Sequence, residues 1–111
     1  MKNKRSLILL LLACCLAQTA FGQTGFGLRD CGEWIARKDV AGQRNIENWL
    51  AGYVSGINAG HWLNHNNDDP LKKINSASQI YLWMDNFCLK NPLNNIAVGG
   101  LELLIELQKK K

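Results

Sequence analysis

Residues 45–63, NIENWLAGYVSGINAGHWL, fit the pattern of a buried helix face closely. Apolar side chains recur three and four positions apart through this stretch, as they do along one face of an α-helix. These positions are Ile46, Trp49, Leu50, Tyr53, Val54, Ile57 and residue 61 or 62. The stretch therefore predicts a long amphipathic helix, with the side chain of Asn45 as its N-terminal cap.

Three glycines, Gly52, Gly56 and Gly60, stand four residues apart in that helix and so form a row along it. Each glycine costs about 1 kcal/mol of helix stability relative to alanine. We therefore expect a compensating close approach, in which the row forms a shallow groove that another part of the fold fills. The candidates to fill it are the aromatic residues Trp34, Trp83 and Phe87. The alternative is a groove that binds a partner.

Three further helices are expected. The first is a short helix capped by Asp30 that fades at Lys38, and the second opens with a capping-box pattern at Ser76 and ends before Pro92. The last helix begins at Asn94 or Asn95 and runs to the terminal lysines. No strand-like alternation appears, so the chain is expected to be all-α, a single small domain of about four helices.

The first residues are typical of a secretory signal. Lys2, Lys4 and Arg5 precede an apolar run, Leu7 to Ala17, and small residues follow up to Gly22. The run is about eleven residues, short of the roughly 20 that a permanent membrane helix needs. We therefore expect residues 1–22 to be a signal peptide, residues 23–111 to be the helical domain, and the protein to be periplasmic or secreted without a stable membrane span.

A second interpretation of the N-terminus is a lipoprotein signal. Residues 11–14, LLAC, resemble a bacterial lipobox, in which Cys14 would become the acylated first residue. Against this, the apolar run before Cys14 would be only seven residues long, and Cys15 would stay beside it as an unpaired thiol.

Cysteine usage predicts one disulfide. Cys31 and Cys88 are the two cysteines that remain after the expected cleavage, and a cysteine pair in an exported chain is typical of a disulfide. The pair is 57 residues apart, so the bond would contribute roughly 4 kcal/mol in the chain-entropy model. A domain of this size depends on such a bond, because its hydrophobic core alone is marginal.

The charge balance argues against a nucleic-acid partner. Of the 13 basic residues, three belong to the expected signal, which leaves ten against nine acidic residues and a net charge of +1. A nucleic-acid-binding domain should show a basic face, and none is visible. The terminal lysines, Lys109 to Lys111, suit the negative end of a helix dipole, with an anionic membrane surface as the alternative.

No catalytic or cofactor site is predicted. His61 and His65 have the spacing of a zinc pair, but their place at a helix end favours solvated side chains, so no metal site is expected. Asp68 and Asp69 lie on a polar loop, and Asp85 lies opposite the apolar stripe of its helix, where we expect a solvated carboxylate. The serines show no nucleophile elbow. We expect a non-enzymatic protein without a cofactor.

The four tryptophans differ in their expected roles. Trp34, Trp49 and Trp83 lie on apolar stripes and are expected in the core. Trp62 lies beside the polar loop, where it is expected to stay partly exposed and to anchor a partner protein.

Three motifs together resemble the HdeA-like acid-stress chaperones of the bacterial periplasm. They are CGEWI at residues 31–35, AGYVSGIN at 51–58, and a second cysteine, Cys88, that closes the third helix. The same order, with Gly52-Tyr53 and residues 80–92, IYLWMDNFCLKNP, is also similar to the small Tai-type immunity proteins that neutralise type VI secretion effectors. The likeness covers most of residues 30–108.

The first resemblance implies folded dimers at neutral pH that loosen in acid, expose apolar surface and hold other proteins soluble. Of the family's residues, only the cysteines carry over, onto Cys31 and Cys88. Protonating nine carboxylates and two histidines would raise the net charge from +1 to about +12, which favours expansion. The second resemblance implies an immunity or inhibitor protein, although that family often carries more than one disulfide. A third hypothesis is an accessory protein of an envelope complex.

Overall fold

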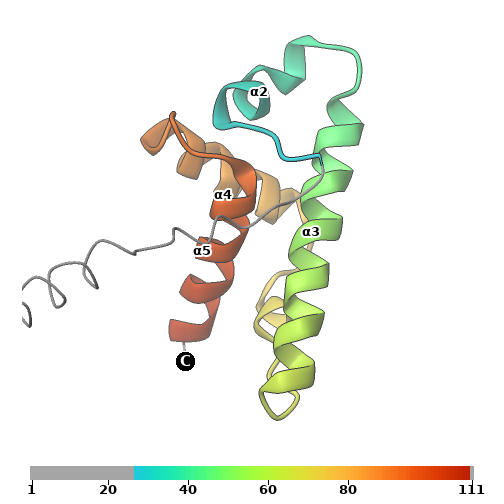
Figure 1. Ribbon diagram of the computed structural model, residues 1–111, viewed down its shortest axis with the longest axis vertical. Coiled ribbons are helices and arrows are strands. Elements are labelled where there is room, and N and C mark those ends of the chain that lie inside the picture. The colour runs from blue at the N-terminus through green and yellow to red at the C-terminus, as the bar shows by residue number, and fades with distance from the viewer. Residues whose placement is uncertain (1–26, 111) are drawn as a thin grey trace, which may run out of the picture.

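The computed structural model describes residues 27–110, which form a helical domain (Figure 1). The predicted signal, its cleavage site and Cys14 lie outside the described residues. Within residues 27–110, four α-helices and two 3-10 helices follow one another. They are α2 (Cys31–Ala36), η1 (Arg37–Asp39), α3 (Gln43–Asn64), η2 (Pro70–Lys73), α4 (Ala77–Lys90) and α5 (Ile96–Lys109).

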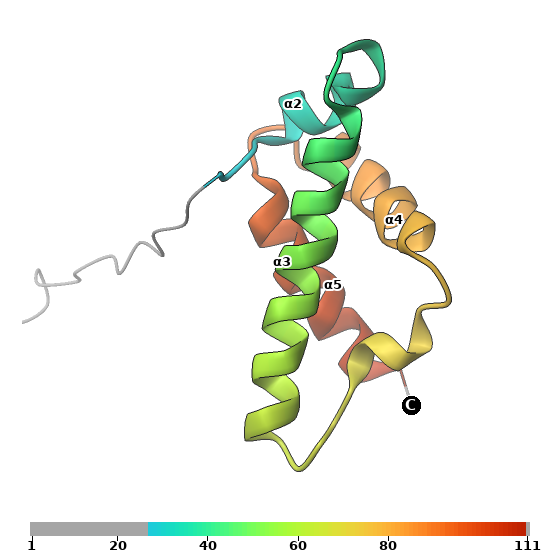
Figure 2. The same cartoon turned by 90° about the vertical axis from the view of Figure 1, so that its right-hand side faces the viewer.

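The prediction of an all-α domain is confirmed for the described part of the chain. The long helix α3 runs along one side of the molecule, with α2 and η1 at one end of it and η2 near the other (Figures 1 and 2). α3 packs chiefly on α5, α2 packs on α4, and α4 packs on α5. None of the helices in residues 27–110 is long and apolar enough to cross a membrane.

Local side-chain chemistry explains where the helices begin. Asp30 and Glu33 form a reciprocal capping box at α2, since Asp30 Oδ1 accepts from the Glu33 amide at 2.8 Å and Glu33 Oε2 accepts from the Asp30 amide at 3.1 Å. Asn95 caps α5 by accepting from the Val98 amide at 3.0 Å. Both caps tie down the segments that lead into the helices.

One predicted cap is wrong, and a second lies at its predicted residue, Ser76, without the predicted capping box. α3 begins after Gly42, which adopts a left-handed conformation with φ of 106°, so Asn45 already lies in the first turn rather than at the cap. At α4, Ser76 makes no side-chain cap bond, and Gln79 accepts instead from the Asn75 amide at 2.7 Å.

The core lies where α2, α3, α4 and α5 meet. Its largest fully buried side chains include Trp34, Leu50, Met84 and Ile96, and the disulfide adjoins them. Cys31 and Cys88 are bonded across a Cα–Cα distance of 5.0 Å, which confirms the predicted pairing. The bond fastens the start of α2 to the last turn of α4.

Close helix packing depends on two glycines of α5 rather than on the glycines of α3. A Cβ atom at Gly99 would lie 2.5 Å from Met84 Sδ, and one at Gly100 would lie 3.1 Å from Tyr53 Cε1. Because Gly99 has no side chain, Met84 of α4 can pack directly on the α5 backbone. Gly100 allows Tyr53 of α3 to do the same.

Candidate functional site

A buried ionic cluster joins three separate elements of the fold. The guanidinium of Arg37, on η1, donates to Asp85 Oδ1 of α4 at 2.7 Å and to Glu47 Oε1 of α3 at 3.0 Å. It also lies 3.8 Å from the ring centroid of Trp34, and Trp34 Nε1 donates to the same Asp85 oxygen at 2.8 Å. We call these residues, Trp34, Arg37, Glu47 and Asp85, the Arg37 cluster.

The Arg37 side chain is only 3% exposed, and it is the one charged side chain in residues 27–110 that is buried. Burial alone would raise the pKa of Asp85, but the hydrogen bonds and charge of Arg37 outweigh it, with help from Trp34. The pKa of Asp85 is therefore lowered below its usual value, so the carboxylate stays ionised until the solution becomes distinctly acidic.

The expectation that Asp85 is a solvated carboxylate is wrong. Asp85 is mostly covered, because α2 and η1 pack over that side of α4 and bring Trp34 and Arg37 onto it. Arg37 and Glu47 were not predicted as site residues. One signal was available in the sequence: Arg37 follows Cys31 and Trp34 at helical spacing, which places a charge on the buried face of the first helix.

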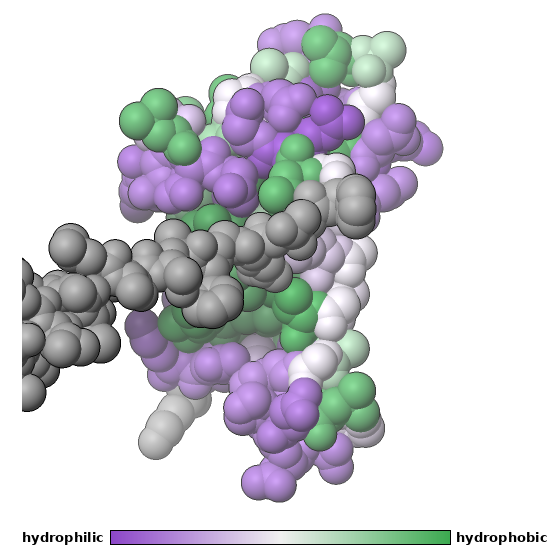
Figure 3. All heavy atoms as spheres, in the orientation of Figure 1, coloured by the Kyte–Doolittle hydropathy of each residue, from purple (hydrophilic) through white to green (hydrophobic). Residues whose placement is uncertain are grey.

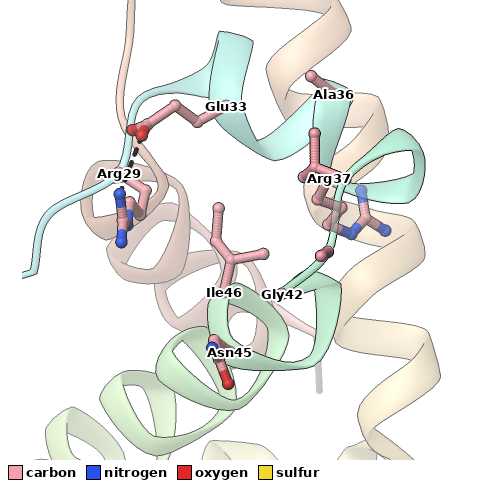
Figure 4. A pocket seen from close by; sticks show the side chains of 9 residues that line it. Arg29, Glu33, Ala36, Arg37, Gly42, Asn45 and Ile46 are labelled. Atoms are coloured by element: carbon pink, nitrogen blue, oxygen red, sulfur yellow. Dashed lines mark hydrogen bonds and ion pairs between the residues drawn. The ribbon is translucent and has the colours of Figure 1, made fainter.

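A surface pocket of about 370 Å³ lies beside the cluster, between α2, η1 and the start of α3 (Figure 4). Arg29 and Glu33 form an ion pair at 3.0 Å on one of its walls, while Ile46 and Asn45 rise from α3. Arg37 extends its guanidinium away from that ion pair, toward α4 (Figure 4). The pocket lining combines the Arg29–Glu33 ion pair with the apolar side chains of Ala36, Val40 and Ile46.

The predicted glycine row on α3 is open to solvent. Gly52, Gly56 and Gly60 are exposed, and an added Cβ at any of them would meet no atom within 4 Å outside its own helix turn. The expected internal filling is therefore wrong: Trp34 is buried between α2 and α4, while Trp83 and Phe87 stack on each other along α4. The fold leaves the row on the outward face of α3 because Leu50 and Val54 turn the opposite face to the core.

The outward face of α3 has an unusual composition for an exposed helix. No Asp, Glu, Lys or Arg occurs between Glu47 and the end of the helix at Asn64. Trp62 is 42% exposed, as its place beside the loop predicted, and Leu63 is 73% exposed. Binding of a partner by Gly52, Gly56, Gly60 and Trp62 stays a prediction.

The two histidines lie together at the end of α3. Their rings stack with centroids 4.2 Å apart, His61 Nε2 bonds to Asp68 Oδ2 at 2.9 Å, and His65 Nδ1 donates to the His61 carbonyl at 3.1 Å. The hydrogen bond from His61 lowers the pKa of Asp68. Within residues 27–110, no group of three His, Cys, Asp or Glu side chains is gathered as a metal site would require.

Comparisons of this sequence and fold with protein-family models, characterised proteins and solved structures give no match.

Proposed function

We propose that this is a non-enzymatic protein-binding protein that loosens in acid and then holds other proteins through newly exposed apolar surface, as its resemblance to HdeA-like chaperones implies. The observation that supports the proposal is the Arg37 cluster, which connects η1, α3 and α4 through two carboxylates. The disulfide is compatible with an oxidising compartment such as the periplasm. Dimer formation at neutral pH stays a prediction.

Acid should weaken the contribution of the Arg37 cluster to the stability of the fold. Because the folded pKa of Asp85 is lowered, its ionisation stabilises the fold above the unfolded pKa of about 4, and that stability is lost as the pH falls through the folded value. Arg37 stays charged, so protonation of Asp85 removes one of the two carboxylates that pair with this buried cation. An uncompensated buried charge costs about 3–5 kcal/mol, a large share of the stability of a small domain.

The same event supplies the binding surface. Hydration of Arg37 would require η1 and α2 to move away from α3, which would uncover the fully buried ring of Trp34 together with Leu50 and Met84. The disulfide would keep α2 attached to α4 during this opening, since it does not respond to pH. An open form that stays connected can expose apolar area to an unfolding protein and close again when the pH rises.

The test is suppression of the aggregation of unrelated periplasmic proteins at pH 2–3 by the purified chain 23–111. We expect suppression in that range and none at pH 7. Asp85→Asn should move the onset of suppression to higher pH, because the cluster is weakened before acid is added. Asp39→Asn is the matched control, an exposed carboxylate of the same segment without an ion pair in the described residues. Absence of suppression at pH 2–3 would remove the chaperone proposal.

A second candidate function is that of an immunity or inhibitor protein, and the open face of α3 favours it. That face is uncharged, lined by small residues and already exposed in the folded protein, so it suits a partner bound at neutral pH. The purified chain should then bind one secreted effector tightly at pH 7. Gly56→Leu should abolish that binding and leave the fold intact, because no neighbouring atom obstructs the new side chain. Equal binding by Gly56→Leu would exclude this face.

A further inference from the structure

One end of the molecule gathers lysines from two elements that are far apart in the sequence. Lys73, on η2, donates its Nζ hydrogens to the carbonyl oxygens of Leu107 and Lys110, which fastens η2 to the end of α5. Lys72 therefore lies in the same region as Lys109 and Lys110. We call these four exposed lysines and the last turn of α3 the basic end, the lower end in Figure 1.

The basic end also presents the exposed apolar side chains of Trp62 and Leu63, from the last turn of α3. Hydrophilic side chains gather over the same lower end in Figure 3, with a hydrophobic group at their margin. Tryptophan and lysine side chains are amphipathic, and both are suited to the boundary between the headgroups and the acyl chains of a bilayer. Exposed apolar residues beside a lysine cluster are typical of proteins that dock on a membrane surface.

Acidic side chains balance most of this charge at neutral pH. Three carboxylates lie at the basic end, Asp68, Asp69 and Glu106, and each has a partner. Asp68 bonds to His61 at 2.9 Å, Asp69 accepts from Asn58 at 2.8 Å, and Glu106 pairs with Lys110 at 2.7 Å. Four lysines against three carboxylates leave a net charge of +1.

We propose that the basic end docks on an anionic lipid bilayer, with Lys72 and Lys109 against headgroup phosphates and with Trp62 and Leu63 at the interface. The charge of the surface and its apolar rim both complement such a membrane. This inference is independent of the chaperone proposal, because it concerns the folded protein above the pH at which the Arg37 cluster is lost. Each added positive charge is expected to raise the partition coefficient roughly fivefold.

The experiment is co-sedimentation of the chain 23–111 with vesicles of phosphatidylglycerol mixed with phosphatidylcholine, and with vesicles of phosphatidylcholine alone. At pH 7 we expect partitioning onto the anionic vesicles to exceed partitioning onto the neutral vesicles, and to fall at high salt. Circular dichroism verifies that the fold is intact. Absence of partitioning onto the anionic vesicles, or equal partitioning onto the neutral vesicles, would overturn the proposal.

Variants assign the binding to the basic end. Lys72→Gln with Lys109→Gln should lower partitioning onto the anionic vesicles by roughly 25-fold. Lys90→Gln, which removes an exposed lysine at the end of α4, should change it by less than about twofold. Trp62→Ser should lower it, and Leu93→Ser, a fully exposed leucine away from the basic end, should not.

Two further results would contradict the docking proposal. Losses of equal size for Lys90→Gln and for a single Lys72→Gln change would mean that net charge acts without a defined surface. Displacement of the protein from vesicles by millimolar inorganic phosphate, at constant ionic strength, would indicate a site for a free anion rather than a bilayer surface.

Discussion

Arg37 combines properties that rarely occur in one residue: its side chain is almost fully buried, stacked on an indole and paired with two carboxylates from different helices. Buried ion pairs contribute little net stability, because desolvation offsets the attraction between the charges. Loss of one partner is costly, however, and here acid can remove the charge of Asp85. The residue therefore links the protonation state of the protein to the integrity of its fold.

The loss of stability caused by Arg37→Met should be smaller in acidic than in neutral solution. At pH 7 the substitution leaves Asp85 and Glu47 without their cation and should destabilise the domain by about 2–4 kcal/mol. As the pH falls toward the lowered pKa of Asp85, the wild type begins to lose a carboxylate partner of its buried cation, whereas the variant has no buried cation to leave unpaired, so the stability difference should be smaller at pH 3 than at pH 7. Urea unfolding at the two pH values measures both differences.

The control for this prediction is Lys38→Met, a neighbouring cation that is exposed and lies 3.5 Å from Asp85. It should change stability by less than about 0.5 kcal/mol at either pH. Equal stability losses for Arg37→Met at pH 7 and pH 3 would contradict a pH-dependent role for the cluster.

Tyr53→Phe should stabilise the domain. The Tyr53 hydroxyl is buried and makes no hydrogen bond, and burial raises the pKa of this group. Removing an unsatisfied hydroxyl while keeping the ring stacked on Trp49 should add about 1 kcal/mol to the free energy of unfolding. For a domain of this size the thermal midpoint should rise by roughly 4–8 °C. A lower midpoint would mean that the hydroxyl has a partner.

At the scale of the elements, the packing partners of a helix decide what a glycine does. The glycine row of α3 has helical spacing and suggests a packing groove, yet it lies on the solvent side. The two adjacent glycines of α5, Gly99 and Gly100, attract less notice in the sequence, yet they admit α4 and α3. Spacing identifies residues on a common face, but it does not identify what covers that face.

The same substitution should therefore have opposite effects in the two helices. Gly99→Ala should destabilise the domain by about 1–3 kcal/mol, because the new methyl group would overlap Met84 and Phe87. Gly56→Ala should stabilise it by up to about 1 kcal/mol, because alanine favours the helix and the space is empty. Thermal unfolding of the two variants tests the contrast, and destabilisation by Gly56→Ala would show that the outward face of α3 is covered in solution.

At the scale of the whole molecule, a disulfide and an ionic cluster hold the same pair of helices in two different ways. The Cys31–Cys88 bond joins α2 to α4 at one place, and Arg37 and Asp85 join η1 to α4 one turn of α4 away. The first contact responds to reductant and the second to pH. Under the proposed function, the covalent contact limits how far the acid-opened form can expand.

Without the disulfide, the domain should open at a higher pH than the oxidised protein does. Cys31→Ser with Cys88→Ser removes the constraint on a loop of 57 residues and should cost roughly 4 kcal/mol. Much of the domain's net stability would be lost, so the variant should unfold at a higher pH than the oxidised protein. Acid titrations followed by circular dichroism measure that shift, and identical midpoints would contradict a stabilising role for the bond.

Local sequence information determines the helix types, their approximate ranges and the cysteine pairing of this protein. Helical periodicity is set by near neighbours, so the helix types and approximate ranges of α3, α4 and α5 follow from the chain alone, as does the cysteine pairing when only two cysteines remain. The exposure of Trp62 follows from its place beside a polar loop.

Only the tertiary structure decides which faces are covered. Asp85 looks solvent-facing within its own helix, and it is buried because α2 and η1 pack over it. The α3 glycines look buried within theirs, and they are exposed because the core lies on the other side. Burial is a property of the contacts between elements distant in sequence, and a helical pattern carries no information about which neighbour supplies them.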